Sequence, residues 1–319
     1  MNFGRRICRK ICFVFNKQLP DKLYIQMMYY VKLGKRLHLK HPVLFNEKLN
    51  WLKLYQRRPE YTDMADKYEV RRFVKERIGE EYLIPLLGVW NSVEEIPFDT
   101  LPDQFVLKCT HDSASVVICK DKQHFDREQA KKKLAACMNT NYFWASREWP
   151  YKDIKPRIIA EQYMVDESHT ELKDYKIYCF DGKPALIQVD FGRFTKHERN
   201  LYTTDWKYIN ERFEYPNNPE MQILKPEGLE KMLQLAGRLS TGMPSVRIDF
   251  YSIEGRIHFS EITFYQEGGF VYTLFRPLDL LRNVVKRGVY FLCFPFQFLI
   301  RTDVVFGQEI QRFARLFQI

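Results

Sequence analysis

The feature that most constrains this chain is an alternating run from Ser245 to Tyr265, SVRIDFYSIEGRIHFSEITFY, with Glu254-Gly255 at its centre. Apolar and polar residues alternate through both halves, and this period of two is typical of β-strands. A glycine between two such halves favours a tight turn. The segment therefore predicts a β-hairpin, and its alternation predicts which side chains share a face.

The register of this hairpin follows from keeping charge off its apolar face. A three-residue loop at 254–256 sets Ile248 opposite Ile262, whereas a two-residue loop moves Glu261 onto the apolar face. An unpaired carboxylate buried there is expensive, so we expect the three-residue loop, with Asp249 directly opposite Glu261. The polar face then holds Arg247, Asp249, Glu261 and Thr263.

Two carboxylates opposite each other on a hairpin lie about 5 Å apart, which is a poor arrangement without a cation between them. Asp249 and Glu261 offer the hard oxygen ligands that Mg²⁺ prefers, and Mg²⁺ commonly takes one or two carboxylates together with substrate phosphates. We interpret the pair as a metal site. The alternative is that Arg247 neutralises both acids in an ion pair.

A second segment, Gln104 to Lys120, has the pattern of a strand, a small polar loop and a second strand. Lys108 lies inside the first apolar strand, and the loop runs from Asp112 to Ser115. Small side chains let backbone amides approach phosphate oxygens, while a half-buried lysine supplies positive charge. The pattern indicates a phosphate-covering hairpin, with a lysine that reaches solvent along a sheet edge as the alternative.

A third segment, Glu171 to Asp190, has the pattern of two strands around a turn. By the period of two, Asp174, Lys176 and Tyr178 share one face of the first strand. Arg193 follows just beyond the hairpin. An acid for sugar hydroxyls and cations for phosphate fit a nucleotide, with solvated surface charge as the alternative.

Taken in order, these segments resemble the ATP-grasp superfamily, and within it the TupA-like proteins of teichuronopeptide and polysaccharide biosynthesis. The resemblance covers about two-thirds of the chain. It is carried by FNEKLNWLKL at 45–54, ADKY at 65–68, the Lys108 hairpin, REWPY at 147–151, IAE at 159–161, DYK at 174–176 and the hairpin of Arg247, Asp249 and Glu261.

The resemblance implies an α+β ATP-grasp fold with the nucleotide between two α/β lobes, extended at both ends by amphipathic segments. We expect five parts along the chain. They are a basic amphipathic extension at 1–44, an N-terminal lobe at 45–100, a small subdomain with the phosphate loop at 101–165, a catalytic subdomain with the metal site at 166–275, and an apolar and basic tail at 276–319.

The resemblance also implies ATP and Mg²⁺ as cofactors and a role for each candidate residue. Thr263 departs from the metal-binding Asn of many ATP-grasp enzymes, and Ala114 from a common loop Gly. By this resemblance Lys108 contacts the phosphates under a loop with Ser113 and Ser115, the strand with Glu161, Tyr163 and Met164 binds adenine, and Asp174 holds ribose. Lys176 and Arg193 would face phosphate or acyl phosphate. Asp249 and Glu261 would ligate Mg²⁺, and Arg247 would stabilise the transition state.

The implied reaction joins a carboxylate to an amine through an acyl phosphate during capsular or exopolysaccharide biosynthesis. The implied carboxylate substrate is an acidic saccharide that contains a uronic acid, and the implied amine substrate is an amino acid. A glycosyltransferase of surface polysaccharide assembly is the alternative, although no two aspartates in the chain have the Asp-x-Asp spacing. A non-catalytic RNA or lipid binder is a further alternative, but the basic residues are dispersed, so we expect no nucleic-acid partner.

Charge and cysteine content indicate where the protein works. The formal charge of +10 favours an anionic partner. Seven cysteines without a Cys-x-x-Cys pair indicate reduced thiols in the cytoplasm. The uncharged run Gly288 to Ile300 is shorter than the about 20 residues that a spanning helix needs. Together with the basic N-terminus, it indicates attachment to the anionic inner face of the membrane, with packing of both ends on the protein body as the alternative.

Overall fold

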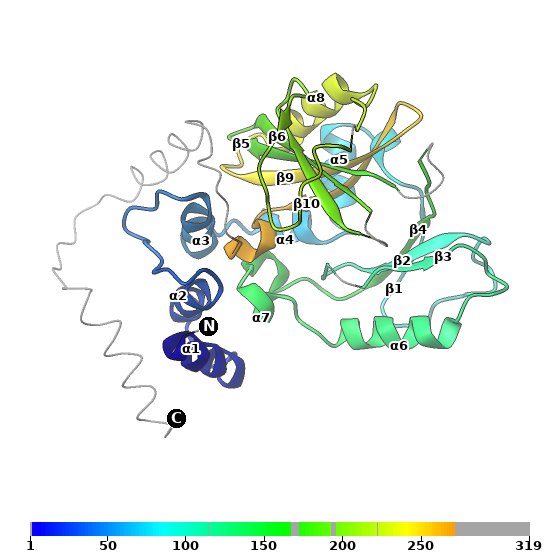
Figure 1. The fold of residues 1–319 in the computed structure, drawn as a ribbon. Helices are drawn as coiled ribbons and strands as arrows, with labels where there is room; N and C mark the ends of the chain where they lie inside the picture. Colours follow the sequence, from blue (N-terminus) through cyan, green and yellow to red (C-terminus); the bar gives the residue numbers. More distant parts are fainter. Residues whose placement is uncertain (1, 114, 167–171, 193–195, 222, 272–319) are drawn as a thin grey trace. The chain divides into compact units, whose positions relative to one another are not determined.

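The computed structural model describes residues 2–113, 115–166, 172–192, 196–221 and 223–271 (Figure 1). The chain divides into two compact units, Met1–Leu37 and His38–Val284. In the smaller unit, helix α1 (Phe3–Val14) packs against helix α2 (Asp21–Leu33). The Asn2 side chain caps α1 by accepting a hydrogen bond from the Arg5 amide. Three side chains of α1 are buried, namely Cys8, Ile11 and Cys12.

The larger unit contains helices and two antiparallel sheets. The described residues form the α-helices α3 (Phe45–Tyr55), α4 (Glu60–Ala65), α5 (Val70–Arg77), α6 (Arg127–Met138), α7 (Phe143–Ser146) and α8 (Leu229–Leu239), with the 3₁₀ turns η1 (Glu80–Tyr82), η2 (Trp149–Tyr151) and η3 (Gln266–Gly269).

The first sheet has four strands in the order β1-β4-β2-β3. Helix α6 packs on it, and Leu134 of α6 is buried with Phe105 and Leu107 of β2. The alternation of β2 turns these apolar side chains toward the helix and Lys108 toward the opposite face. The strands are β1 (Leu86–Trp90), β2 (Phe105–Cys109), β3 (Val117–Cys119) and β4 (Ile158–Gln162).

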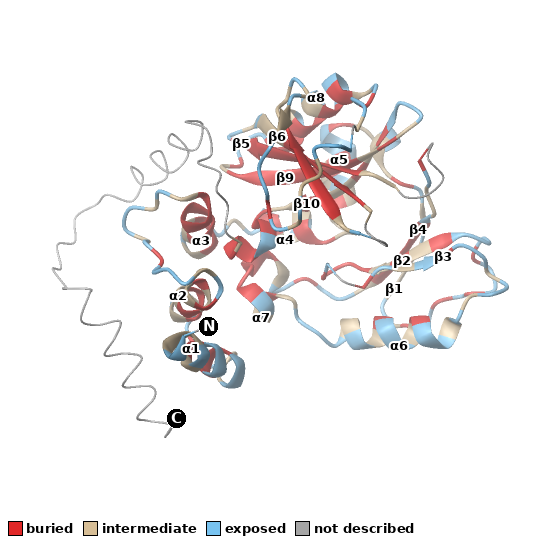
Figure 2. Cartoon of the chain, viewed as in Figure 1, coloured by how far each residue is buried: buried red, intermediate tan, exposed pale blue. Residues whose placement is uncertain are grey.

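The second sheet has six strands in the order β10-β9-β5-β6-β7-β8. Strand β5 is buried along its whole length and β9 along most of its length, as Figure 2 shows. The strands are β5 (Asp174–Phe180), β6 (Lys183–Phe191), β7 (Glu198–Tyr202), β8 (Tyr208–Ile209), β9 (Val246–Ile253) and β10 (Arg256–Thr263).

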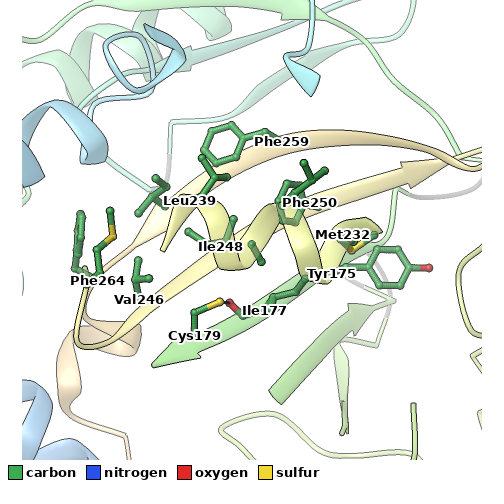
Figure 3. Close-up of a cluster of buried hydrophobic side chains, with 14 of the residues drawn as sticks. Tyr175, Ile177, Cys179, Met232, Leu239, Val246, Ile248, Phe250, Phe259 and Phe264 are labelled. Atoms are coloured by element: carbon green, nitrogen blue, oxygen red, sulfur yellow. Dashed lines mark hydrogen bonds between the residues drawn. The ribbon is translucent and has the colours of Figure 1, made fainter. Parts of the chain in front are cut away.

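Helix α8 covers one face of the second sheet and forms the main hydrophobic core with it (Figure 3). The helix presents Met232 and Leu239 from a strongly amphipathic sequence, and the strands present Ile177, Ile248 and Phe250. Because alternate strand residues point to opposite faces, this packing leaves the charged residues of β5 and β9 on the face away from α8.

The hairpin of β9 and β10 has the predicted pairing of Asp249 with Glu261, but its loop differs from the prediction. The loop is the two-residue turn Glu254-Gly255, whose positive φ angles of 49° and 75° match the twist of a tight hairpin. The register slips by one between Phe259 and Glu261, so a β-bulge takes the place of the expected third loop residue. The expected three-residue loop was therefore wrong, although the register at the carboxylates was correct.

The predicted C-terminal tail, including Gly288 to Ile300, lies outside the described residues. Within the residues that are described, none of the helices combines the length and the apolar character needed to span a membrane.

Candidate active site

The open face of the six-stranded sheet gathers charged side chains on three neighbouring strands. Asp249 of β9 pairs across the strands with Glu261 of β10 on one side and with Lys176 of β5 on the other. Asp174 and Arg247 share this face because each lies two residues from a member of this row. Alternation along β5 and β9 therefore concentrates both signs of charge in one place.

Arg247 forms ion pairs with both predicted metal ligands. Its Nε and Nη2 atoms donate to the two carboxylate oxygens of Asp249, each at 2.7 Å, and Nη2 also donates to Glu261 Oε1 at 2.9 Å. Lys176 Nζ donates to Asp249 at 2.8 Å and to Asp174 at 3.0 Å. The ion pair that the sequence allowed as an alternative is thus present.

The surrounding cations keep Glu261 ionised. Burial raises the pKa of Glu261, but the charges of Arg247, Lys176 and Lys67 outweigh burial and lower this pKa to about 2. A carboxylate that is already deprotonated and oriented can accept a cation without first losing a proton.

Lys108 lies on the first sheet and donates to Glu161 Oε2 at 2.8 Å. Arg71 donates to the other oxygen of Glu161 at 3.3 Å. Burial lowers the pKa of Lys108, but the Glu161 carboxylate more than offsets burial, so this pKa is raised and Lys108 remains a cation. The half-buried lysine that the sequence predicted is therefore positive and pairs with another predicted site residue.

The loop after β2 is held by its own side chains. Ser115 is buried, accepts a hydrogen bond from the Cys109 amide at 2.7 Å and donates to Asp112. Lys67 donates to the carbonyl oxygen of Asp112. Ser115 therefore shapes this loop, whereas Ser113 is exposed at the edge of the cavity described next.

A cavity of about 600 Å³ is lined by residues of both sheets. It brings together all of the predicted site residues except Ser115, which stabilises the loop, and Arg193, which lies outside the described residues. The predicted residues on its wall are Lys108, Ser113, Glu161, Tyr163, Met164, Asp174, Lys176, Arg247, Asp249 and Glu261.

The donor set fits a metal that binds together with a substrate. Across the described parts of the chain, no group of three or more His, Cys, Asp or Glu side chains is placed to hold a metal by itself. Asp249 and Glu261 supply two carboxylates, which is the number that Mg²⁺ takes when phosphates complete its coordination.

Sequence reasoning gave no role to several residues of the cavity wall. Lys67 belongs to the ADKY segment, but nothing in its local pattern indicates a contact with a loop more than forty residues later. Further residues lie where the cavity meets β6, β7 and the turn η3, and their spacing in sequence is too wide to form a motif. They are Asp190, His197, Arg199, Tyr215 and Glu267.

The larger unit is thus an α+β fold in which two antiparallel sheets line one cavity of lysines, an arginine and paired carboxylates. A profile of TupA-like ATPgrasp proteins matches residues 47–282, which is more than half of the chain. The chain therefore belongs to the TupA-like ATP-grasp family, and the predicted family and fold class are confirmed. Membership supports ATP-dependent ligation as the general class of activity.

Several solved structures are similar to the chain at low identity. A D-alanine–D-alanine ligase from Bacillus anthracis is 15% identical over 70% of this chain and 68% of that chain, with a TM-score of 0.39. The ATP-grasp ligase PsnB, complexed with a precursor variant, Mg and ADP, is 10% identical over 76% and 66%, with a TM-score of 0.43. The D-cycloserine synthetase DcsG is 14% identical over 73% and 72%, with a TM-score of 0.41. A comparison with curated proteins gives no match.

Proposed function

We propose that the protein is an ATP- and Mg²⁺-dependent carboxylate–amine ligase that works through an acyl phosphate. The observation that carries this proposal is the shared cavity, in which Lys108, Lys176 and Arg247 line the same space as the opposed carboxylates. Phosphoryl transfer needs positioning and charge neutralisation more than covalent chemistry, and this set of charges supplies both.

Each residue then has a defined role. Lys108 and Lys176 would contact phosphate oxygens, and Arg247 would stabilise the charge that develops on the transferred group. Asp249 and Glu261 would hold Mg²⁺, which supplies neutralisation of the phosphate charge when bound. The remaining roles also stay as the sequence predicted them, with Ser113 at the phosphates, Glu161, Tyr163 and Met164 at the adenine, Asp174 at the ribose and Arg193 at the acyl phosphate.

We further propose that the carboxylate belongs to a uronic acid and that the amine belongs to an amino acid, in capsular or exopolysaccharide biosynthesis. Support comes from the TupA-like family and from the basic charge of the chain, which suits an acidic saccharide. A glycosyltransferase would consume a nucleotide sugar instead of ATP, so replacing ATP with nucleotide sugars separates the two functions.

Hydroxylamine trapping tests the ligase directly. Incubation with ATP, Mg²⁺, glucuronic or galacturonic acid and hydroxylamine should release phosphate and form a hydroxamate, because hydroxylamine captures an acyl phosphate without an amine substrate. ATP binding is measured in parallel by calorimetry. Undetectable ATP binding at millimolar concentration with Mg²⁺ and the acids present, together with no hydroxamate, would contradict the proposed function.

A further inference from the structure

The cavity continues across the six-stranded sheet to a region that the roles above leave unused. Arg199 of β7 lies three strands from Asp249, which corresponds to roughly 14 Å at the usual strand spacing. Arg199 pairs with both carboxylate oxygens of Asp190, through Nε at 2.6 Å and Nη2 at 3.2 Å. Arg199 Nη1 alone then faces Glu214 at 3.3 Å and Glu267 at 3.8 Å.

Charge is therefore distributed unevenly along the cavity. Toward Lys108, cations on the described wall outnumber carboxylates by five to four, which suits a polyanion. Toward Glu267, two hydrogen bonds of Arg199 go to Asp190, so on the described wall it is the Nη1 atom of Arg199 that pairs with Glu214 and Glu267. The first region is formed by Lys67, Lys108, Lys120, Lys176 and Arg247 against Glu161, Asp174, Asp249 and Glu261.

An aromatic wall adjoins this region. Tyr215, the residue after Glu214 in the chain, lines the cavity, and its ring lies 3.8 Å from that of His197, centroid to centroid. The Arg199 guanidinium lies 4.8 Å from the centre of the Tyr215 ring, so this wall already accommodates a cation. An ammonium group bound at Glu267 would therefore lie near an aromatic ring that tolerates positive charge.

The turn that carries Glu267 is fixed by buried side chains of α3. Lys53 Nζ donates to the Gly268 carbonyl oxygen at 2.6 Å, and Asn50 Nδ2 donates to the Gly269 carbonyl oxygen at 2.8 Å. Both side chains are fully buried. The FNEKLNWLKL segment, for which sequence reasoning gave no role, thus holds the turn from which Glu267 reaches the cavity.

We propose that Glu267, with Glu214 beside it, binds the ammonium group of the amine substrate and selects a free primary amine as the nucleophile. This inference rests on the proposed ligase function. Burial and the neighbouring Glu267 raise the pKa of Glu214 to about 7, as expected for two carboxylates pressed together. A bound ammonium group relieves that repulsion.

The carboxylates of Glu214 and Glu267 can also accept the first proton that the ammonium group loses. The ammonium group must lose one proton, which a carboxylate of the pair accepts, before its nitrogen lone pair can attack the acyl carbon. The C–N bond then forms, the bond from carbon to the phosphate oxygen breaks, and phosphate leaves with that electron pair. The second proton leaves the nitrogen with the phosphate, and the proton on the carboxylate passes to solvent.

A binding experiment tests this selection without turnover. L-alanine and L-glutamate, each beside its Nα-acetylated form and with ethylamine as a probe lacking a carboxylate, are titrated calorimetrically into the protein loaded with ADP and Mg²⁺. We expect at least one free amine to bind at least tenfold more tightly than its acetylated form. Glu267→Gln should reduce this ratio at least tenfold, whereas Glu211→Gln, which changes an exposed carboxylate three residues before Glu214, should leave it unchanged.

Every outcome decides the inference. Equal binding of free and acetylated probes, no binding of any free amine, or an unchanged ratio in Glu267→Gln would overturn it. Failure of the ligase function is distinguishable, because it appears as missing hydroxamate in the wild-type protein, an assay in which no amino acid is present. Circular dichroism melting of Glu267→Gln tests whether the variant is folded, so that a reduced preference for the free amine over its acetylated form can be separated from unfolding.

Discussion

At the scale of single residues, Glu148 has an environment that opposes its charge. The side chain is 4% exposed and accepts a hydrogen bond from Ser146 Oγ at 2.6 Å. Burial raises the pKa of Glu148 to about 7, and the opposing charge of Lys53 offsets only part of this effect. At mildly acidic pH the folded protein therefore holds a proton at Glu148 that the unfolded chain has released.

The raised pKa predicts a defined pH dependence of stability. Glu148 contributes stability below its unfolded pKa of 4.5, and this contribution is lost as the pH rises to about 7. Glu148→Gln should remove that loss, so that the variant gains up to about 3 kcal/mol relative to wild type between pH 4.5 and 8. Urea unfolding at several pH values measures the difference. Identical pH dependence in the variant and wild type would show that Glu148 titrates normally.

The two predicted metal ligands should respond differently to substitution. Asp249 is fully buried between Arg247 and Lys176, so Asp249→Asn leaves buried cations poorly paired and costs on the order of 3 kcal/mol. Glu261 has a side chain that is 33% exposed, and Glu261→Gln should cost less. Both variants should lose most turnover, at least 100-fold, because the metal loses a ligand.

Glu261→Gln is therefore the more informative variant for the metal site. Its turnover should fall and the Mg²⁺ concentration for half-maximal activity should rise, while its free energy of unfolding should decrease by less than that of Asp249→Asn. Lys108→Ala serves as a comparison, because it should chiefly weaken nucleotide binding. Unchanged turnover in both carboxylate variants would assign Asp249 and Glu261 to a purely structural ion pair.

At the scale of elements, the turn η3 is closely packed at its glycines. Gly268 has a φ of 61°, and a Cβ added to it would lie 2.7 Å from Ser146 Cβ. Gly242 has a φ of 78° but has no atom within 4 Å of such a Cβ. The two glycines share a left-handed backbone and differ in the space around them, so they form a matched pair.

Comparing alanine variants of these two glycines measures how much the close packing around η3 contributes to the free energy of unfolding. Gly242→Ala should cost about 1 kcal/mol, from the backbone conformation alone. Gly268→Ala should cost about 3 kcal/mol, because the added methyl group also displaces Ser146 or the turn. Denaturant unfolding of the two variants measures both values. Equal losses would mean that the turn adjusts freely, and the fixed placement of Glu267 would then lack support.

Patterns of alternation predict those parts of the site that lie on single strands or hairpins. The pairing of Asp249 with Glu261 followed from avoiding a buried unpaired carboxylate, a local argument that holds whatever surrounds the hairpin. The bulge near Ser260 could not be foreseen, because an extra loop residue and an extra strand residue give the same register at Asp249.

Long-range contacts set the limit of prediction from a single sequence. Lys53 reaches the Gly268 carbonyl oxygen across 215 positions of the chain, and no local periodicity records such a partner. The same holds for Arg199, whose partners Glu214 and Glu267 come from a loop and from the turn η3. The fold class could be predicted because the motifs that indicate it are local in sequence. The part of the cavity near Arg199 and Glu267 could not be predicted, because it forms only when distant segments meet in the folded chain.

At the scale of the whole molecule, α1 presents apolar and basic side chains to solvent. Phe3, Phe13 and Val14 are 79%, 84% and 52% exposed. Ile11 of the same helix is buried. The exposed apolar side chains are accompanied by exposed basic residues of the same segment. These are Arg6, Arg9, Lys10 and Lys17.

Attachment to an anionic membrane remains our prediction for this helix. Each exposed Lys or Arg near an anionic surface contributes about 1 kcal/mol, and shallow insertion of the two phenylalanines adds apolar burial. The full-length protein should pellet with phosphatidylserine vesicles at low salt and should be released at high salt. Phe3→Ser combined with Phe13→Ser should weaken pelleting several-fold, and removal of residues 1–17 should abolish its salt-sensitive part. Equal amounts in solution with and without vesicles would exclude attachment.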